Sequence, residues 1–232
     1  MGGEGQVDAF AATAPLVSID ALASSADARD RVVVEHAAAL FLERGIADVK
    51  MTDIAEAAGM GVATLYRHHS TKTNLVILVG TYLWSVINVR IRTLVESDEF
   101  LALDGSSRLS TLLEEYCQTY AAHSDFVRFV DEFDHLALVE HVSPAELAGY
   151  GAEVDSFYVM FEDAYLLGRQ DGSITREVDF PVFYRAVAHA LMGIAEKLER
   201  GEIIPSDDFS NGIEELGYVV RMAHALLAPQ SL

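Results

Sequence analysis

The sequence predicts an all-α fold in which a small N-terminal three-helix unit leads into a larger helical bundle. Three observations support this fold class. Apolar residues recur at intervals of three and four along most of the chain, which is the period of an amphipathic helix. Gly, Pro, Ser and Asp gather in short stretches between these periodic segments and mark the ends of helices. No segment shows the alternation of apolar and polar residues that is typical of strands.

The N-terminal part divides into an arm and three short helices. Residues 1–28 are rich in Gly, Ala and Ser and lack a sustained period, so we expect a flexible acidic arm. From Arg29 apolar residues repeat at helical spacing until Gly45, which predicts the first helix. The second and third helices are expected over 52–58 and 62–68.

A long helix from about residue 70 to 97 joins this N-terminal domain, residues 29–76, to a second domain, residues 77–232. Within the second domain, Ser143-Pro144 places a capping hydroxyl before a proline at a first helical position. Asp171-Gly172-Ser173 is a turn between two periodic segments. The five helices expected after the long one cover 107–122, 125–141, 144–169, 179–200 and 207–227.

Composition favours a globular protein without a membrane span, since 51% of the 232 residues are hydrophobic. The longest apolar stretch, Leu75–Ile87, has thirteen residues, whereas a membrane helix needs about 20. The single cysteine, Cys117, excludes an intrachain disulfide, and the charged start of a signal peptide is missing because no basic residue precedes Arg29. We expect a cytoplasmic location and no membrane partner.

The net charge of −20 is unevenly distributed. Residues 1–28 hold four acidic and no basic residues, residues 29–80 hold six of each, and residues 81–232 hold twenty-six acidic and ten basic residues. The three segments therefore carry −4, 0 and −16. An acidic field weakens non-specific binding to nucleic acid. The neutral segment is the part of the chain best suited to contact DNA.

The most informative segment is Met51 to Lys72, with the sequence MTDIAEAAGMGVATLYRHHSTK. It predicts two short helices joined by a glycine turn, and small residues such as Ala55 and Ala58 allow the helices to cross closely. The second helix carries a hydroxyl, a phenol and a guanidinium at a spacing that suits a helix in the DNA major groove. The next helix, starting near Ser70, adds backbone N–H groups that favour phosphate. These features predict a helix-turn-helix.

Together with Leu40-Phe41 and Glu43-Arg44-Gly45, this segment resembles the DNA-binding domain of TetR-type transcriptional regulators. The resemblance depends on Asp53-Ile54-Ala55, Ala57-Ala58-Gly59 and Thr64-Leu65-Tyr66 at fixed spacing, and it covers about a quarter of the chain. It implies that Tyr66, His68 and Lys72 hold phosphates and that Val62, Ala63 and Thr64 face base edges. The residues implied to bind a double-stranded DNA operator are Lys50, Thr52, Gly61, Val62, Ala63, Thr64, Tyr66, Arg67, His68 and Lys72.

Three positions depart from the family pattern. Gly61 stands where a capping Ser is usual, Lys50 where a capping Thr or Ser is common, and His69 where a Phe is usual. A glycine in place of a hydroxyl cap weakens the start of a helix by about a few tenths of a kcal/mol. His69 and the acidic charge leave an alternative open, namely a ligand-binding or partner-binding helical dimer that has lost DNA binding.

Aromatic residues recur at helical spacing beyond residue 81, around Phe126–Phe133 and Phe157–Tyr165. The resemblance implies that this domain binds a small, largely apolar effector between its helices. An aromatic stripe is more often core than pocket, so core packing remains an alternative for each residue. The candidate lining residues are Trp84, Tyr116, Tyr120, Phe129, Phe133, Phe157, Phe161, Tyr165 and His189.

The last two predicted helices, 179–200 and 207–227, each carry an apolar stripe. In the TetR-type family the corresponding pair forms a four-helix bundle with the partner subunit, which implies a homodimer through these helices. Packing within one subunit also accounts for the stripes. A dimer holds two recognition helices about 34 Å apart on one face of DNA, as a palindromic operator requires. The resemblance implies a repressor that its effector releases from DNA.

No catalytic constellation is evident, and we expect neither an enzyme nor a cofactor. Glu132-Phe133-Asp134-His135 is a Glu-x-x-His, the element that di-iron carboxylate bundles use twice, but the chain holds no second copy. At about 100° per residue, His135 lies opposite the apolar face marked by Phe126. We therefore interpret Asp131, Glu132 and His135 as a solvated face with no metal site, and Cys117 as a buried apolar residue.

Overall fold

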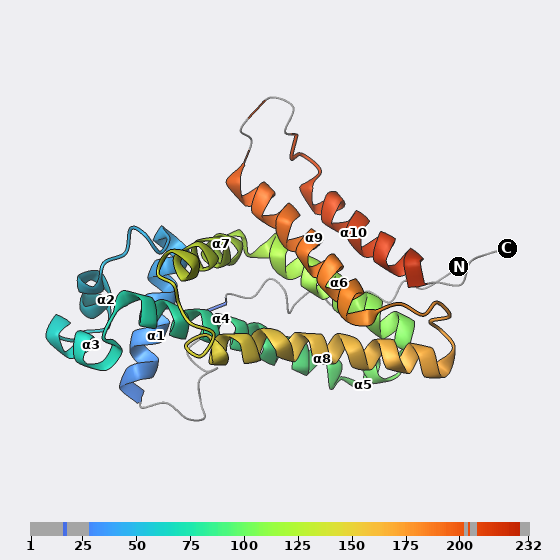
Figure 1. Ribbon diagram of the computed structural model, residues 1–232, viewed down its shortest axis with the longest axis horizontal. Coiled ribbons are helices and arrows are strands. Elements are labelled where there is room, and N and C mark those ends of the chain that lie inside the picture. The colour runs from blue at the N-terminus through green and yellow to red at the C-terminus, as the bar shows by residue number, and fades with distance from the viewer. Residues whose placement is uncertain (1–15, 18–27, 202–203, 205–207, 228–232) are drawn as a thin grey trace.

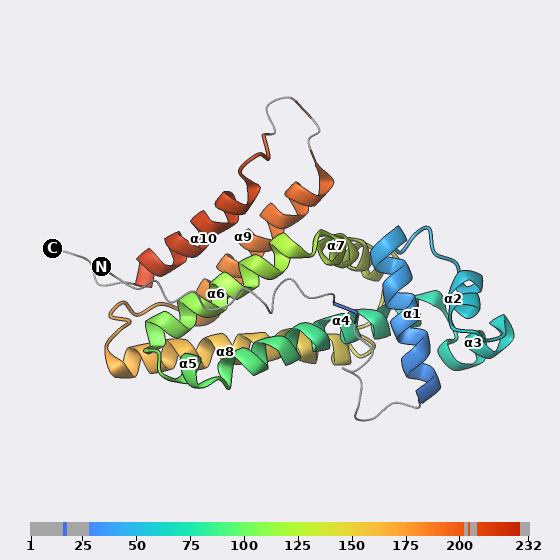
Figure 2. The same cartoon turned by 180° about the vertical axis from the view of Figure 1, so that it is seen from behind.

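In a computed structural model the protein is elongated, with a small helical head at one end of a larger helical body (Figures 1 and 2). The structure describes residues 16–17, 28–201, 204 and 208–227. Over these residues the chain forms ten α-helices and no strand, which confirms the all-α prediction. The predicted flexible arm lies mostly outside the described residues. Leu16, one of its two described residues ahead of the first helix, is 3% exposed and lies beside Ala39 and Leu42 of that helix.

The head consists of α1 (Ala28–Arg44), α2 (Met51–Ala57) and α3 (Val62–His69). Its core is formed by Phe41, Ile54 and Leu65, one from each helix, and all three are fully buried. The helices form as predicted because apolar residues recur at three and four, and α1 and α2 are each followed by a glycine at positive φ, whereas α3 ends at Ser70 with a φ of +56°. At the end of α1, Gly45 has a φ of +82°, a conformation that residues with a Cβ rarely adopt.

The long helix α4 (Lys72–Val95) runs from the head into the body. Thr71 caps its start, and the Thr71 hydroxyl accepts a hydrogen bond of 3.1 Å from the backbone N–H of Asn74. Length and composition alone would allow α4 to cross a membrane, but 61% of its most apolar stretch is buried inside the protein. Because Leu75, Val79 and Leu83 are fully buried, α4 is accounted for as a core helix of this fold.

Six further helices build the body around α4 (Figure 1). α4 and α8 pack along each other, α6 crosses α8, and α7 contacts both α1 and α9. α9 and α10 form an antiparallel pair on the outside of the body (Figures 1 and 2). Their bounds are α5 Asp98–Leu101, α6 Gly105–Ala122, α7 Ser124–Val139, α8 Ala148–Asp171, α9 Phe180–Arg200 and α10 Gly212–Leu227.

Three boundaries differ from the predictions. The short helix α5 was not predicted, and it is capped by Ser97, whose hydroxyl accepts from the N–H of Phe100. The predicted start at Pro144 is wrong, since the hydroxyl and the N–H of Ser143 both donate to Glu146 and close a turn before α8 begins. α10 begins at Gly212 rather than at residue 207; just before it, the N–H of Ser210 donates to the carboxylate of Asp208 at 2.9 Å.

The crossing of α6 and α8 depends on glycine. A Cβ at Gly105 would lie 1.9 Å from the backbone N of Gly168, and a Cβ at Gly168 would lie 2.6 Å from Ile174. Gly105 also donates its N–H to the carboxylate of Asp171 at 2.8 Å. These contacts fix how α6 and α8 are placed, and side chains from both helices line the pocket described below.

Candidate nucleic-acid interface and internal pocket

The recognition helix α3 is held on one side and open on the other. Leu65 is fully buried and His69 is 5% exposed, so these two residues anchor the helix in the head. Tyr66 is 49% exposed, and Arg67 and His68 are also exposed. A phenol, a guanidinium and an imidazole therefore point away from the head core. This is the arrangement that a helix needs to contact DNA without disturbing its own packing.

The start of α3 relies on backbone geometry alone. Gly61 is its N-cap, with φ −73° and ψ 138°, and no side chain caps the helix. The turn before it contains Gly59 at a φ of +64°. The unbonded N–H groups at the start of α3 are thus free of a competing hydroxyl, at a helix end that favours anions.

The predicted DNA-contacting residues that flank α3 differ in exposure and in their hydrogen bonds within the head. Lys50 and Thr52 are exposed at the start of α2. The amine of Lys72 instead donates to the carbonyl of Ala47 at 3.3 Å, across the connection between α1 and α2. Burial lowers the pKa of Lys72, although carboxylates at Glu132, Asp48 and Asp53 act in the opposite direction. Lys72 therefore helps to hold the head together, in addition to any phosphate contact.

None of the ten residues implied to contact DNA is buried. Seven are exposed, and three are half-buried beside them. Asp53, which the resemblance did not include among the contacts, binds Arg44 at 3.2 Å and accepts the N–H of Lys50 at 3.1 Å. This hydrogen bond is the main cause that lowers the pKa of Asp53. The exposed residues are Lys50, Thr52, Gly61, Ala63, Tyr66, Arg67 and His68, and the half-buried ones are Val62, Thr64 and Lys72.

His69 occupies the position of an apolar residue in the head. Its Nε2 is buried without a hydrogen bond and lies 3.8 Å from the carboxylate of Asp30. Burial lowers the pKa of His69, which Asp30 only partly offsets. The neighbouring His68 lies 3.5 Å from the same carboxylate. The carboxylate of Asp30, in the first turn of α1, therefore lies close to both imidazole rings.

A cavity of about 590 Å³ lies inside the body, between α4, α6, α7, α8 and α9. This volume is within the range of small-molecule sites. Four of the nine predicted ligand-binding residues line it: Trp84, Tyr116, Tyr120 and His189. Sequence patterns missed Tyr150, Tyr158 and Tyr184, as well as the charged residues Asp134, Asp155 and Arg185.

The remaining five predicted residues do not line this cavity. Phe129, Phe133, Phe157 and Phe161 are almost fully buried. Phe133, Phe157 and Phe161 pack against rings that line the cavity, whereas Phe129 packs against Phe41 and Phe133. Phe133 stacks on Tyr150 with ring centroids 4.3 Å apart. Tyr165 stacks instead on Phe180 at 4.7 Å and accepts the N–H of Val178 at 3.2 Å. Core packing, the alternative left open above, explains these five residues.

The polar groups of the cavity interact mainly through tyrosine. The hydroxyl of Tyr120 donates to that of Tyr116 at 2.7 Å. Burial is the main cause that raises the pKa values of Tyr116, Tyr120, Tyr150 and Tyr184, so all four remain neutral hydrogen-bonding groups. The buried indole N–H of Trp84 lies near the Tyr150 hydroxyl without the geometry of a full hydrogen bond.

α7 connects the cavity to the head. Val130 and Asp134 line the cavity. From the same helix, Glu132 accepts the N–H of Ile46 and Arg128 donates to the carbonyl of Leu42, both at the C-terminal end of α1. Glu132 is therefore not simply part of a solvated face, as its position in the sequence suggested. Asp131 pairs with Arg200 at 3.0 Å, and His135 is exposed.

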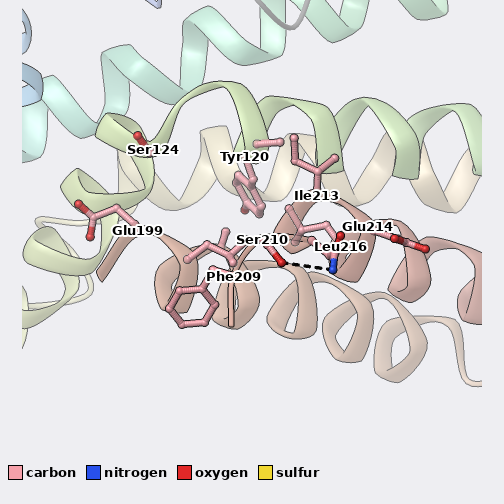
Figure 3. A pocket seen from close by; sticks show the side chains of 13 residues that line it. Tyr120, Ser124, Glu199, Phe209, Ser210, Ile213, Glu214 and Leu216 are labelled. Carbon is pink, nitrogen blue, oxygen red and sulfur yellow. Dashed lines mark hydrogen bonds between the residues drawn. The ribbon is translucent and has the colours of Figure 1, made fainter. Parts of the chain in front are cut away.

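A second cavity, of about 610 Å³, lies at the outer edge of the body between α6, α9 and the start of α10. Figure 3 shows Tyr120, Ile213 and Leu216 gathered around it. Tyr120 lines both cavities. The second cavity is formed partly by the segment Phe209–Asn211 outside the helices, whereas the aromatic cavity is lined by helices alone. We therefore consider the aromatic cavity to be the better effector site.

The outer face of α9 and α10 is apolar. Met222 is 62% exposed, and Val182, Tyr218 and Leu226 are exposed as well. An apolar groove of about 470 Å³ runs between the two helices. Exposed apolar patches of this kind mark interaction surfaces. Among the described residues, no group of three or more His, Cys, Asp or Glu side chains is placed to hold a metal, and Cys117 is buried.

Comparison with known proteins places these features in a family context. Residues 33–79 match the family model of bacterial regulatory proteins, tetR family. The HTH-type transcriptional repressor KstR2 of Rhodococcus jostii (strain RHA1) is 27% identical over 164 residues, covering 70% of this chain and 76% of the relative. KstR2 of Mycobacterium tuberculosis (strain ATCC 25618 / H37Rv) is 26% identical over 175 residues, covering 73% and 80%.

Solved structures share the fold over most of the chain. A TetR transcription regulator from Haloarcula marismortui ATCC 43049 superposes with a TM-score of 0.67 at 20% identity, covering 86% of this chain and 96% of that one. The ketosteroid transcriptional regulator KstR2 of Mycobacterium tuberculosis superposes with a TM-score of 0.56 at 20% identity, covering 89% and 98%. The matched segment 33–79 contains α2 and α3 in full, with most of α1 and the start of α4.

Proposed function

We propose that this chain, which is similar to TetR-type transcriptional regulators, is a cytoplasmic, homodimeric repressor that a ligand in the aromatic cavity releases from a palindromic operator. The observation that carries the proposal is the recognition helix. α3 is anchored by Leu65 and exposes Tyr66, Arg67 and His68, inside the one segment of the chain whose acidic and basic residues balance. A helix with this arrangement suits direct contact with a DNA groove. The role proposed is regulatory, with no catalytic step.

The exposed apolar face of α9 and α10 supports a homodimer. Met222, Tyr218 and Leu226 project from α10, and Val182 projects from α9. Covering this face with a second copy buries apolar side chains that water otherwise surrounds, which is the main driving force for association. Two heads are then held at a fixed separation, which a palindromic operator requires.

Two connections support coupling between the cavity and the head. α4 runs from Lys72 at the head to Trp84 at the cavity, a span of about 18 Å along the helix. α7 contributes Asp134 to the cavity and Glu132 to the end of α1. A ligand that displaces either helix changes how the head is held. By thermodynamic linkage, the factor by which the ligand lowers the affinity for DNA equals the factor by which DNA lowers the affinity for the ligand.

Fluorescence anisotropy tests the proposal. The purified full chain is titrated onto labelled duplexes from the intergenic DNA upstream of its gene, and onto scrambled duplexes, over a series of salt concentrations. The proposal predicts saturable, sequence-selective binding that weakens as salt rises, because phosphate contacts release counterions. Gln118→Ala, which changes an exposed residue of α6, is the control for the Met222→Glu variant of α10 described next.

The absence of selective binding even at low salt would contradict the proposal. It would favour the alternative of a ligand-binding or partner-binding dimer without DNA binding. Sedimentation analysis of the same preparation separates the two parts of the proposal, because a monomer fails on dimerisation irrespective of DNA. Met222→Glu on the outer face of α10 is expected to dissociate the dimer, since it places a charge in a face that must be desolvated.

A further inference from the structure

The aromatic cavity is built as a rigid cage. Trp84 packs edge-on against Phe126 and Phe157, with ring centroids 5.0 and 5.4 Å away. Tyr150 stacks on Phe133, and Tyr184 packs edge-on against Phe161 at 5.3 Å. Each of these cavity rings is thus fixed from behind by a buried phenylalanine. Fixed rings lose little conformational freedom when a ligand binds.

Negative charge lies on the open side of this cage. Asp134 of α7 and Asp155 of α8 both line the cavity and are exposed. Neither carboxylate has an ion-pair or hydrogen-bond partner among the described residues. The charged groups that act on Asp134 are the carboxylates of Glu196 and Asp131, and both of these pair with Arg200. Arg185 is the one guanidinium in the lining, and His189 is the other basic group. The body around the cavity also carries a strong negative charge, −16 over residues 81–232.

We propose that the ligand of this cavity is an amphipathic organic cation, an ammonium group carried on an apolar body. Aromatic faces attract a cation electrostatically, and a desolvated cage strengthens this attraction. Asp134 and Asp155 supply the counter-charge, and the apolar body occupies the space beside Val130, Val154 and Met192. This inference rests on one part of the proposed function, namely that the aromatic cavity is the effector site.

Other ligand classes fit the lining less well. An anion would gain from Arg185 but would face two carboxylates without partners and the acidic body around them. A neutral apolar ligand would fill the cage yet leave Asp134 and Asp155 without a counter-charge, since Arg200 pairs with Asp131 and Glu196 instead. A cation supplies the missing counter-charge. The charge of the ligand is therefore the property that distinguishes the classes.

Trp84 is the only tryptophan in the chain and lines the cavity, so its fluorescence reports occupancy directly. Three probes of similar size are titrated: phenethyltrimethylammonium, the neutral isostere in which carbon replaces the nitrogen, and phenylbutanoate. The proposal predicts that the cation binds about tenfold or more tightly than the neutral isostere and that phenylbutanoate binds most weakly. Equal or tighter binding of either other probe, or no response to the cation, would overturn it.

Variants tie the response to this site. The double variant Asp134→Asn/Asp155→Asn is expected to weaken cation binding about fivefold or more and to leave the neutral isostere unaffected. Asp163→Asn, on an exposed position of α8 outside the cavity, is the matched control. Tyr150→Phe keeps the ring and should retain the preference for the cation. If both double and control variants bind the cation as the parent does, the acidic protein surface binds it and the proposal fails.

The outcome is independent of the DNA measurements. A chain that binds the cation in the cavity but no operator retains this inference and loses the proposed function. A chain that binds its operator selectively but prefers the neutral isostere retains the function and loses the inference.

Discussion

The head and the body place their polar and aromatic groups in opposite ways. In the head, Tyr66, Arg67 and His68 project into solvent from a helix held by Leu65. In the body, Trp84 and Tyr116 face inward, and phenylalanines pack against them from behind. The head is electrically neutral over residues 29–80, whereas the body carries most of the negative charge.

Because of this difference, the residues that contact DNA in the head are not the residues that stabilise it, whereas in the body the same helices stabilise the fold and line the cavity. An exposed side chain on α3 can be removed without opening a void, so its loss should affect DNA binding alone. A change in the body disturbs helices that both form the core and line the cavity.

Gly105→Ala should have the largest effect. A methyl group at Gly105 would overlap the backbone of Gly168, so α6 and α8 must separate. We expect the free energy of unfolding to fall by about 3 kcal/mol, measured by urea unfolding followed by circular dichroism. Gly151→Ala, in α8 with open space around it, is the control and should be neutral or slightly stabilising. Equal stability of Gly105→Ala and the parent would show that the helices do not cross as described.

Tyr66→Ala should weaken operator binding about tenfold while leaving thermal stability unchanged, because the side chain is 49% exposed. Anisotropy titrations and thermal unfolding of the same preparation measure the two quantities. Lys72→Ala is less clean, since its amine also binds the carbonyl of Ala47. A loss of stability in Tyr66→Ala, or undiminished affinity, would contradict the separation of roles in the head.

Glu132→Gln should reduce the coupling between head and body. The carboxylate of Glu132 accepts the N–H of Ile46, and a neutral amide makes a weaker acceptor at this contact. We expect the factor by which a cavity ligand lowers operator affinity to shrink about threefold, as judged by anisotropy with and without phenethyltrimethylammonium. Glu140→Gln, exposed at the end of α7, is the control. An unchanged factor in Glu132→Gln would assign the coupling to α4 instead.

His69→Phe should alter the pH dependence of stability by less than about 1 kcal/mol. Burial lowers the pKa of His69 in the folded head below its ordinary value. The unfolded chain then binds the proton more readily, so the parent loses stability as pH falls through about 6.5 and below. The phenylalanine variant lacks this loss, and the difference in unfolding free energy should grow in its favour with acidity. Parallel pH profiles would show that His69 is not desolvated.

The same variant bears on the alternative function. Phenylalanine is the residue expected at this position from the family resemblance. A large gain in operator affinity with His69→Phe would mean that the natural chain is an impaired DNA-binding protein. Unchanged affinity would mean that the histidine is compatible with a working head.

The sequence predicted the helices of the head well because the residues that form them are close together in the chain. α2, the glycine turn and α3 lie within one contiguous segment, so spacing alone identifies which side chains share a face. The cavity is assembled from five helices, and periodicity does not tell which side of a doubly buried helix faces a void. Phe157 and Tyr116 therefore received the same prediction, although one is core and the other lines the cavity. Tyr150, Tyr184 and Asp155 were missed for the same reason.

The most direct test of the account is to fill the cavity and measure DNA binding. Ala188 of α9 lines the cavity, and Ala188→Phe adds a ring to it without depending on any ligand. Gln170→Phe, at an exposed position of α8, adds the same group outside. The account predicts that Ala188→Phe alters the Trp84 fluorescence and weakens operator binding, while Gln170→Phe does neither. Full operator affinity in a folded Ala188→Phe protein with altered Trp84 fluorescence would contradict the claim that the cavity controls the head.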